Sequence, residues 1–143
     1  MKFYSRKDKV FTLIIIGISL FLIGITINNL INKKFSDEGY WFLLLIFSVV
    51  GFLLWMFFGT NYELSKQNGF IYRNGPFRGK IKTQRITEII KGKTLWVGFR
   101  PATARKGLII KYDKYNELYI SPKTNEKFIV EILKLNSEIK ISE

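Results

Sequence analysis

Two long stretches without a charged side chain dominate the first 62 residues of this 143-residue chain. The first runs from Val10 to Asn32 and the second from Gly39 to Tyr62, and each holds more than 20 residues. An α-helix rises about 1.5 Å per residue, so roughly 20 residues cross a hydrocarbon core of about 30 Å. In lipid the backbone must satisfy its own hydrogen bonds, which favours helices even in Ile-rich segments. The sequence therefore predicts a transmembrane helical hairpin over 10–58, with helices over 10–31 and 40–58 and a short loop over 32–39.

The alternatives for these stretches are core helices of a soluble protein and a cleaved signal peptide. A chain of this length could not cover two helices that are apolar on every side. Between Phe11 and Ile27 there are 12 Leu, Ile or Phe residues, which favour membrane insertion by roughly 4–7 kcal/mol. The stretch is also too long for the apolar region of a signal peptide, and no small-residue cleavage pattern follows it. We therefore expect an uncleaved anchor.

The net charge of +12 is unevenly distributed along the chain. Residues 1–9 carry +3, the connection 32–38 is neutral, and residues 59–143 carry +9. Lys and Arg stay preferentially on the cytoplasmic side of a membrane. We therefore expect a protein of the cell membrane with two spans and an outer loop. Its cytoplasmic parts would be a basic flank over 1–9 and a domain over 59–143, so that both termini lie in the cytoplasm.

The excess positive charge is concentrated in residues 73–114, which hold twelve Lys or Arg against Glu88 and Asp113. Each basic side chain near an anionic leaflet adds up to about 1 kcal/mol of attraction. Within this segment, residues 98–107 have the composition of a long loop, and long loops often carry function. Arg100, Arg105 and Lys106 of this loop are the candidate contacts with an anionic surface. The alternative is that these charges only solvate the domain.

The composition and motifs argue against catalysis and against nucleic-acid binding. Histidine and cysteine are both absent, which removes the commonest general base, the commonest metal ligand and any thiolate site. No glycine-rich phosphate loop, helix-turn-helix, zinc knuckle or RNP-like motif is present. Ser121 and Lys123 could form a Ser-Lys pair, but Ser121 also suits a helix cap. We expect no enzyme activity, no catalytic residue, no cofactor, no metal site and no nucleic-acid partner.

After the hairpin, short apolar segments alternate with turns, which is typical of an antiparallel meander. Asn68-Gly69 and Asn74-Gly75 supply the positive φ angles of tight turns. The expected strands cover residues 62–65, 70–73, 79–82, 108–112 and 117–120. Residues 86–90 are ambiguous and are expected to form a short turn or bend leading into a fourth strand, which residues 94–97 extend or follow.

A C-terminal helix is expected to close the open face of these strands. Either Ser121 or Thr124 can cap it, and Pro122 at the first helical position favours Ser121. The helix should run to about Leu135 with Phe128 and Ile132 on its apolar face. Residues 136–143 are expected to fray. Strands followed by one terminal helix are the arrangement of a PH-like domain.

Three segments resemble the YyaB-like family of bacterial PH domains: Phe70 to Ile81 (FIYRNGPFRGKI), Ile86 to Ile89 (ITEI) and Leu118 to Lys123 (LYISPK). Phe128 and the preceding apolar anchor also fit, and the resemblance covers roughly residues 60–135. It implies an α+β protein in which a transmembrane hairpin precedes a small antiparallel β-barrel or sheet capped by a C-terminal helix. The family has no established binding residues, so the resemblance adds no site.

The resemblance also suggests a function. The sublancin-immunity branch of this family protects a bacteriocin-producing bacterium from its own secreted antimicrobial peptide. The anchor, small size and basic charge of this chain are similar to that branch, which implies a membrane-anchored immunity protein. Its partners would be the membrane and either the secreted peptide or the membrane target of that peptide. The alternative is a membrane-tethered module that binds anionic lipid or a protein partner and has no role in immunity.

Overall fold

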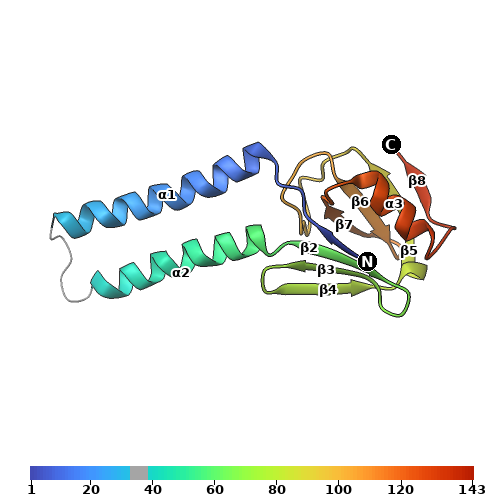
Figure 1. The fold of residues 1–143 in the computed structure, drawn as a ribbon, viewed down its shortest axis with the longest axis horizontal. Helices are drawn as coiled ribbons and strands as arrows, with labels where there is room; N and C mark the ends of the chain where they lie inside the picture. Colours follow the sequence, from blue (N-terminus) through green and yellow to red (C-terminus); the bar gives the residue numbers. More distant parts are fainter. Residues whose placement is uncertain (33–38) are drawn as a thin grey trace.

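The computed structural model describes residues 1–32 and 39–143. A pair of long helices extends from one end of a β-rich domain, and both chain termini lie in that domain (Figure 1). The charged connection expected over 32–39 falls mostly on residues 33–38, outside the described residues. In order, the elements are β1 (Lys2–Tyr4), α1 (Lys9–Ile31), α2 (Gly39–Phe58), β2 (Asn61–Ser65), β3 (Gly69–Asn74), β4 (Phe77–Ile81), a 3₁₀ turn (Thr83–Arg85), β5 (Ile86–Lys91), β6 (Leu108–Tyr112), β7 (Asn116–Ile120), α3 (Asn125–Leu133) and β8 (Lys140–Ser142).

The two N-terminal helices are long and apolar enough to cross a membrane. Only 11 % of the most apolar window of α1 and 17 % of that of α2 is buried. A core helix of a soluble protein would be mostly covered, so these helices expose apolar surface that needs an apolar environment. The buried residues of α1, Ser19 and Thr26, are seven apart on one face, and each hydroxyl donates to a carbonyl one turn earlier at 2.8 Å. That face packs on α2, where Ile46 and Val50 are buried.

The domain consists of two four-stranded sheets, in the orders β1-β2-β3-β4 and β7-β6-β5-β8. All neighbouring strands are antiparallel except β5 and β8, which are parallel. The meander expected from the Asn-Gly turns is confirmed: Phe70 pairs with Leu64 on one side and with Ile81 on the other. Gly69 and Gly75 adopt φ angles of 72° and 57°, as such turns require.

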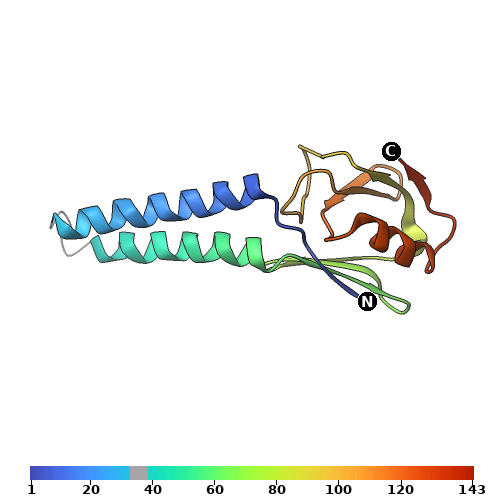
Figure 2. The same ribbon diagram turned by 45° about the horizontal axis from the view of Figure 1, so that its top comes forward.

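One core lies between the two sheets, and α3 covers its open side (Figure 2). Phe128 of α3 is fully buried, and its ring packs edge-on against Phe3 of β1 at 5.2 Å and Phe70 of β3 at 5.5 Å. Ile89 of β5 and Ile110 of β6 complete the core from the second sheet. The C-terminal helix, which was predicted to cover the strands, therefore packs against a core formed by both sheets.

The start of α3 differs from the expectation that Ser121 or Thr124 caps the helix. Thr124 is the residue before the helix, with φ −131° and ψ 109°, but its side chain makes no capping bond. Pro122 lies before α3 instead of at its first position, because it forms an isolated bridge with Ser5. Ser121 is fully buried and bonds to other hydroxyl groups instead of capping a helix. The helix also ends at Leu133, two residues before the expected end.

Residues at both ends of the chain form strands that the sequence did not predict. Residues 1–9 were expected to be a basic flank, yet Lys2–Tyr4 pairs with β2. Residues 136–143 were expected to fray, yet Lys140–Ser142 pairs with β5 and Ile139 is buried. Conversely, residues 94–97 form no strand, because Gly92 turns away from β5 at a φ of 78°. The loop between β5 and β6 therefore covers 92–107.

Candidate functional site

The connection between β1 and α1 joins the helices to the domain. Its backbone is bonded to three separate parts of the chain. Ser5 donates to the Thr60 carbonyl at 3.3 Å, Arg6 to Ser121 at 2.7 Å and Asp8 to Thr103 at 3.1 Å. Because β1 precedes α1 and β2 follows α2, pairing of β1 with β2 closes the base of the helix pair. The helices are therefore held by the sheet itself instead of by a free linker.

A buried cluster of hydroxyl groups fixes this connection to the 92–107 loop. The Ser5 hydroxyl lies 2.8 Å from those of Thr103 and Ser121. The Tyr62 hydroxyl donates to the Pro101 carbonyl at 2.6 Å and accepts from the Ser121 amide at 3.0 Å. Burial, the largest cause, raises the pKa of Tyr62 to about 12, so its hydroxyl keeps its proton at neutral pH. The cluster is one reason why the long loop is ordered.

Asp8 connects the start of α1 to the same loop. Its carboxylate accepts from the Val10 amide at 3.1 Å, which caps α1, and from Arg105 Nε at 2.7 Å. The side-chain bond from Arg105 is the main cause that lowers the pKa of Asp8 to about 2. The carboxylate is therefore ionised at neutral pH, and it neutralises much of the Arg105 charge.

Lys7 performs a similar role at the end of α2. Its ammonium donates to the Phe57 carbonyl and lies 4.4 Å from the centre of the Phe57 ring. A cation at this end of a helix interacts favourably with the helix dipole. Desolvation of Lys7 lowers its pKa to about 8. Lys7 and Asp8 therefore bind the two helix ends that meet at the domain.

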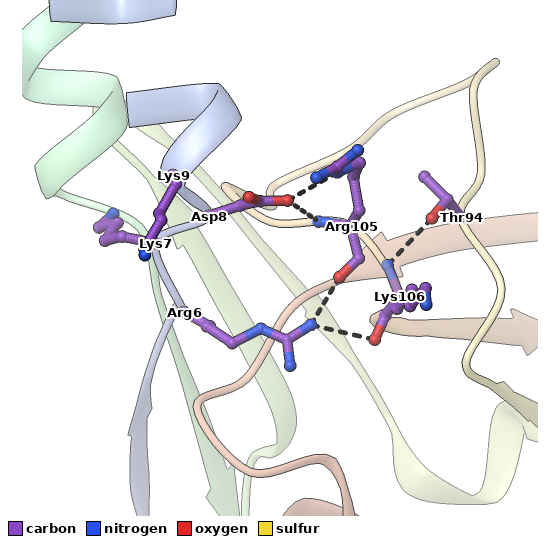
Figure 3. A pocket seen from close by; sticks show the side chains of 7 residues that line it. All are labelled: Arg6, Lys7, Asp8, Lys9, Thr94, Arg105 and Lys106. Carbon is purple, nitrogen blue, oxygen red and sulfur yellow. Dashed lines mark hydrogen bonds and ion pairs between the residues drawn. The ribbon is translucent and has the colours of Figure 1, made fainter. Parts of the chain in front are cut away.

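A hollow of about 590 Å³ lies at this junction. Figure 3 shows Arg6 on one side of it and Asp8, Arg105 and Thr94 around the other. Arg6 Nη2 donates to the carbonyls of Arg105 at 2.5 Å and Lys106 at 3.1 Å. The Lys106 amide donates to Thr94 Oγ1 at 2.9 Å, which holds Lys106 at its left-handed φ of 52°. The lining residues are Arg6, Lys7, Asp8, Lys9, Thr94, Arg105 and Lys106.

The hollow is strongly cationic. Five of its lining side chains are Lys or Arg, and Asp8 is its single carboxylate. Since Asp8 is paired with Arg105, the remaining positive charge is uncompensated within the hollow. Arg, Lys and a Thr hydroxyl are groups that bind phosphate oxygens in proteins. The arrangement is therefore suited to an anionic group such as a phosphate.

The structure brings together two of the three site residues proposed from the sequence. Arg105 and Lys106 line the hollow, whereas Arg100 lies elsewhere in the loop and donates from Nη1 to the Leu95 carbonyl at 3.0 Å. Sequence reasoning missed Arg6 and Lys9 as part of the site, although it noted their charge. Their position immediately before the first apolar stretch was used only to orient the helices. Their contact with the loop depends on β1, which the sequence did not reveal.

The described residues contain no group of three His, Asp or Glu side chains that could hold a metal ion. The Ser-Lys pair considered from the sequence is not assembled in the part of the chain that the structure describes. Ser121 Oγ bonds to Ser5 and to the Thr103 amide, while Lys123 lies exposed on the surface.

The fold is that of a bacterial PH domain carried on two long apolar helices. The family model for the bacterial PH domain matches residues 60–136, and the chain belongs to this family. The chain is also similar to the uncharacterized protein YyaB of Bacillus subtilis (strain 168), with 27 % identity over 142 residues, which cover 99 % of this chain and 97 % of that protein. No solved structure matches the chain. The comparisons confirm the family and the fold, and they do not indicate a specific function.

Proposed function

We propose that this chain is a two-span protein of the cell membrane that holds its PH domain against the inner leaflet. In this proposal both termini are cytoplasmic, and the basic hollow binds the phosphate groups of anionic lipids. The protein acts as a binding module, without a catalysed reaction, a cofactor or a nucleic-acid partner. The observation that carries the proposal is the position of the cationic hollow at the first residue of α1.

The position of the hollow relative to the bilayer follows from the position of the two helices. Lys9 is the first residue of α1 and lines the hollow, and Lys7 binds the last turn of α2. If α1 and α2 span the bilayer, their domain ends lie at the level of the lipid headgroups. Lys and Arg flank the helices on this side, as expected for the cytoplasmic face. The hollow therefore meets the headgroup phosphates without any movement of the domain.

Three of the five cations are available to a phosphate group. Arg105 is paired with Asp8, and the Lys7 ammonium is desolvated against the last turn of α2. Arg6 bonds to the Arg105 and Lys106 carbonyls through Nη2, so the other N–H groups of its guanidinium can still reach a phosphate. Among the described residues, no ion pair involves Arg6, Lys9 or Lys106. These three side chains supply the proposed attraction, whereas Arg105 mainly shapes the wall.

The test compares two variants of the full chain that have equal charge. In the first, Arg6, Lys9 and Lys106 are each replaced by Gln; in the control, exposed Lys66, Lys114 and Lys127 are replaced instead. At about 1 kcal/mol per basic residue, the first variant should lose at least about tenfold in affinity for anionic lipid. Native mass spectrometry of the detergent-solubilised protein with phosphatidylglycerol or phosphatidylcholine measures this preference. Equal losses in both variants would show that only net charge matters and would contradict a site.

This test needs the full chain. A fragment over 60–143 would lack β1, whose Phe3 is in the core, and it would lack Arg6 and Lys9. Failure of such a fragment to bind vesicles would therefore not bear on the hollow.

A second candidate function is immunity to a secreted antimicrobial peptide. It is supported by the anchored PH architecture and by the resemblance to the sublancin-immunity branch of YyaB-like proteins. The protein would bind the peptide or mask its membrane target, and a protein partner would then contact the domain. If a secreted peptide is encoded beside this gene, expression of the chain in a peptide-sensitive bacterium should raise the minimum inhibitory concentration of that peptide. An unchanged inhibitory concentration would remove this candidate and leave lipid binding intact.

A further inference from the structure

Four large apolar side chains that do not line the basic hollow are exposed on the surface of the domain. Trp96, Val97 and Phe99 belong to the 92–107 loop, and Phe77 begins β4. Their exposed fractions are 67 %, 82 %, 45 % and 49 %, respectively. Scattered apolar residues on a surface are ordinary, but several large ones gathered together mark a contact surface. We call these four residues the apolar rim.

Ring contacts hold part of the rim in place. The Phe99 ring lies 6.5 Å from the Phe77 ring and 5.7 Å from the Tyr72 ring. The Phe99 carbonyl accepts from the Tyr119 amide at 3.4 Å. Trp96 and Val97 precede Phe99 in the loop, where the bond from Arg100 to the Leu95 carbonyl supports the turn. The rim therefore joins one loop and one strand into a single surface.

The turn between β3 and β4 fixes the rim next to the end of α2. Gly75 of this turn has a φ of 57°, and a Cβ there would lie 3.0 Å from Met56 Cγ. Met56 is in the last turn of α2, and Phe77 follows Gly75 by two residues. The 92–107 loop, drawn in yellow to orange, lies beside the start of α1 in both views (Figures 1 and 2). The two segments that carry the rim therefore lie beside the domain ends of the two helices.

We propose that the apolar rim enters the interfacial region of the same bilayer that α1 and α2 cross. The proposal rests on the two spans of the proposed function, but not on the basic hollow. Aromatic side chains, and Trp above all, favour the region between headgroups and acyl chains. Exposed Lys93 and Arg78 flank the rim in sequence and would lie near the phosphates.

A membrane accounts for the rim better than a protein partner does. Gly75, two residues before Phe77, lies against Met56 in the last turn of α2, so a bilayer around α2 would end close to the rim. The adjoining charged residues of the loop are all basic: Lys93, Arg100, Arg105 and Lys106. With the helix pair already fixed to β1 and β2, insertion of the rim gives the domain a third point of contact. The domain would then have one fixed tilt on the membrane.

The test uses tryptophan fluorescence of the full chain in lipid nanodiscs. Trp41→Phe with Trp55→Phe leaves Trp96 alone, because the chain has three Trp residues. Lipids brominated near the headgroup should reduce Trp96 emission at least twofold, in phosphatidylcholine as well as in phosphatidylglycerol. The matched control lacks all three Trp and carries Tyr115→Trp, in the turn at the far end of β6. Tyr115 is 85 % exposed, and emission from this position should be unchanged.

A variant that keeps only Trp55 separates failure of the rim from failure of the spans. Trp55 lies in the last turn of α2. Quenching of Trp55 without quenching of Trp96 would contradict insertion of the rim and would still be consistent with the two spans. Unquenched Trp55 would overturn the spans and the rim together. Quenching of Trp96 only in phosphatidylglycerol would also overturn the rim, because electrostatic attraction alone would then hold the loop.

A second measurement avoids the Trp substitutions. The chain has no cysteine, so Val97→Cys provides a unique site for a nitroxide spin label. We expect this label to be accessible to oxygen in the bilayer and shielded from a water-soluble nickel chelate. A label at Tyr115→Cys should show the opposite accessibility. Equal exposure of both labels to the chelate would contradict insertion.

Discussion

Replacing Phe3 with Ala should lower the thermal midpoint of the PH domain by at least about 10 °C. Phe3 is 8 % exposed and packs edge-on against Phe128. Truncation of a buried Phe to Ala costs about 3–5 kcal/mol. For a domain of this size, each 1 kcal/mol shifts the midpoint by roughly 4–8 °C. The size of the effect follows from β1 being an integral strand of the domain, although it lies before the helices in sequence.

Thermal unfolding of the full chain in detergent, followed by protease cleavage of the domain, measures this shift. The control is Tyr4→Ala on the same strand, where the side chain is 57 % exposed. The control should melt within about 2 °C of the wild type, because surface substitutions usually change stability by less than about 0.5 kcal/mol. If Phe3→Ala melted with the control, β1 would not be part of the folded core.

The second large effect is expected for Tyr62→Phe. Loss of the hydroxyl leaves the Ser121 amide and the Pro101 carbonyl without their buried partner. Each buried group left unsatisfied costs about 1–3 kcal/mol, so the two groups together should cost the domain roughly 2–6 kcal/mol. The 92–107 loop should also exchange its amide hydrogens faster, because Pro101 and Thr103 are held by the same cluster.

Hydrogen exchange read by mass spectrometry separates this loss from a general loss of packing. The control is Tyr72→Phe, because the Tyr72 hydroxyl has no hydrogen-bond partner in the described part of the chain and is only partly buried. Faster exchange across 92–107 in Tyr62→Phe but not in Tyr72→Phe is the expected result. Unchanged exchange in both variants would mean that the hydroxyl cluster does not order the loop.

Alkaline pH should destabilise the domain, as Tyr62→Phe does. The pKa of Tyr62 is raised to about 12 in the folded chain, above the value of about 10 for an unfolded Tyr. The neutral hydroxyl therefore stabilises the fold fully below pH of about 10, and this contribution is lost as the pH rises through about 12. Comparison of the wild type with Tyr62→Phe across this range isolates the contribution, because the variant has no group there to titrate.

The parts of the fold that depend on local pattern were predicted from the sequence. The apolar helices, the Asn-Gly hairpins and the apolar face of α3 each lie within a short segment whose period is visible. Phe128 was placed on the core side of its helix for this reason, and it is fully buried. The run of short antiparallel strands followed by one helix was predicted from the segments themselves, and the family resemblance implied the same PH-like fold.

The parts that depend on long-range pairing were not predicted. The strand β1 holds three residues and pairs with β2 across the whole helical hairpin, and β8 is equally short and pairs with β5. Segments of three residues carry no period, and their pairing is decided by partners distant in sequence. Ser121 shows the same difficulty. Its sequence context favoured a helix cap, but Ser5 and Tyr62 provide a buried hydroxyl cluster that only the fold creates.

The candidate site was predicted only in part, for a related reason. Arg105 and Lys106 stood out as charges in a long loop, and they line the hollow. Arg6 and Lys9 also line the hollow, because the backbone of residues 5–8 is hydrogen-bonded to the domain at Thr60, Ser121 and Thr103. Their charge was visible in the sequence, but their proximity to the loop was not.

The most direct test of the central claim is the side of the membrane on which the PH domain lies. A fluorescent protein joined by a linker after Glu143 folds in the cytoplasm, whereas alkaline phosphatase at the same place is active only outside. We predict a fluorescent membrane fraction and an inactive phosphatase, since in the proposed topology both helices cross the bilayer and return the chain to the cytoplasm. An active phosphatase, or a fusion recovered in the soluble fraction, would contradict the two spans and the lipid-binding site placed at their inner end.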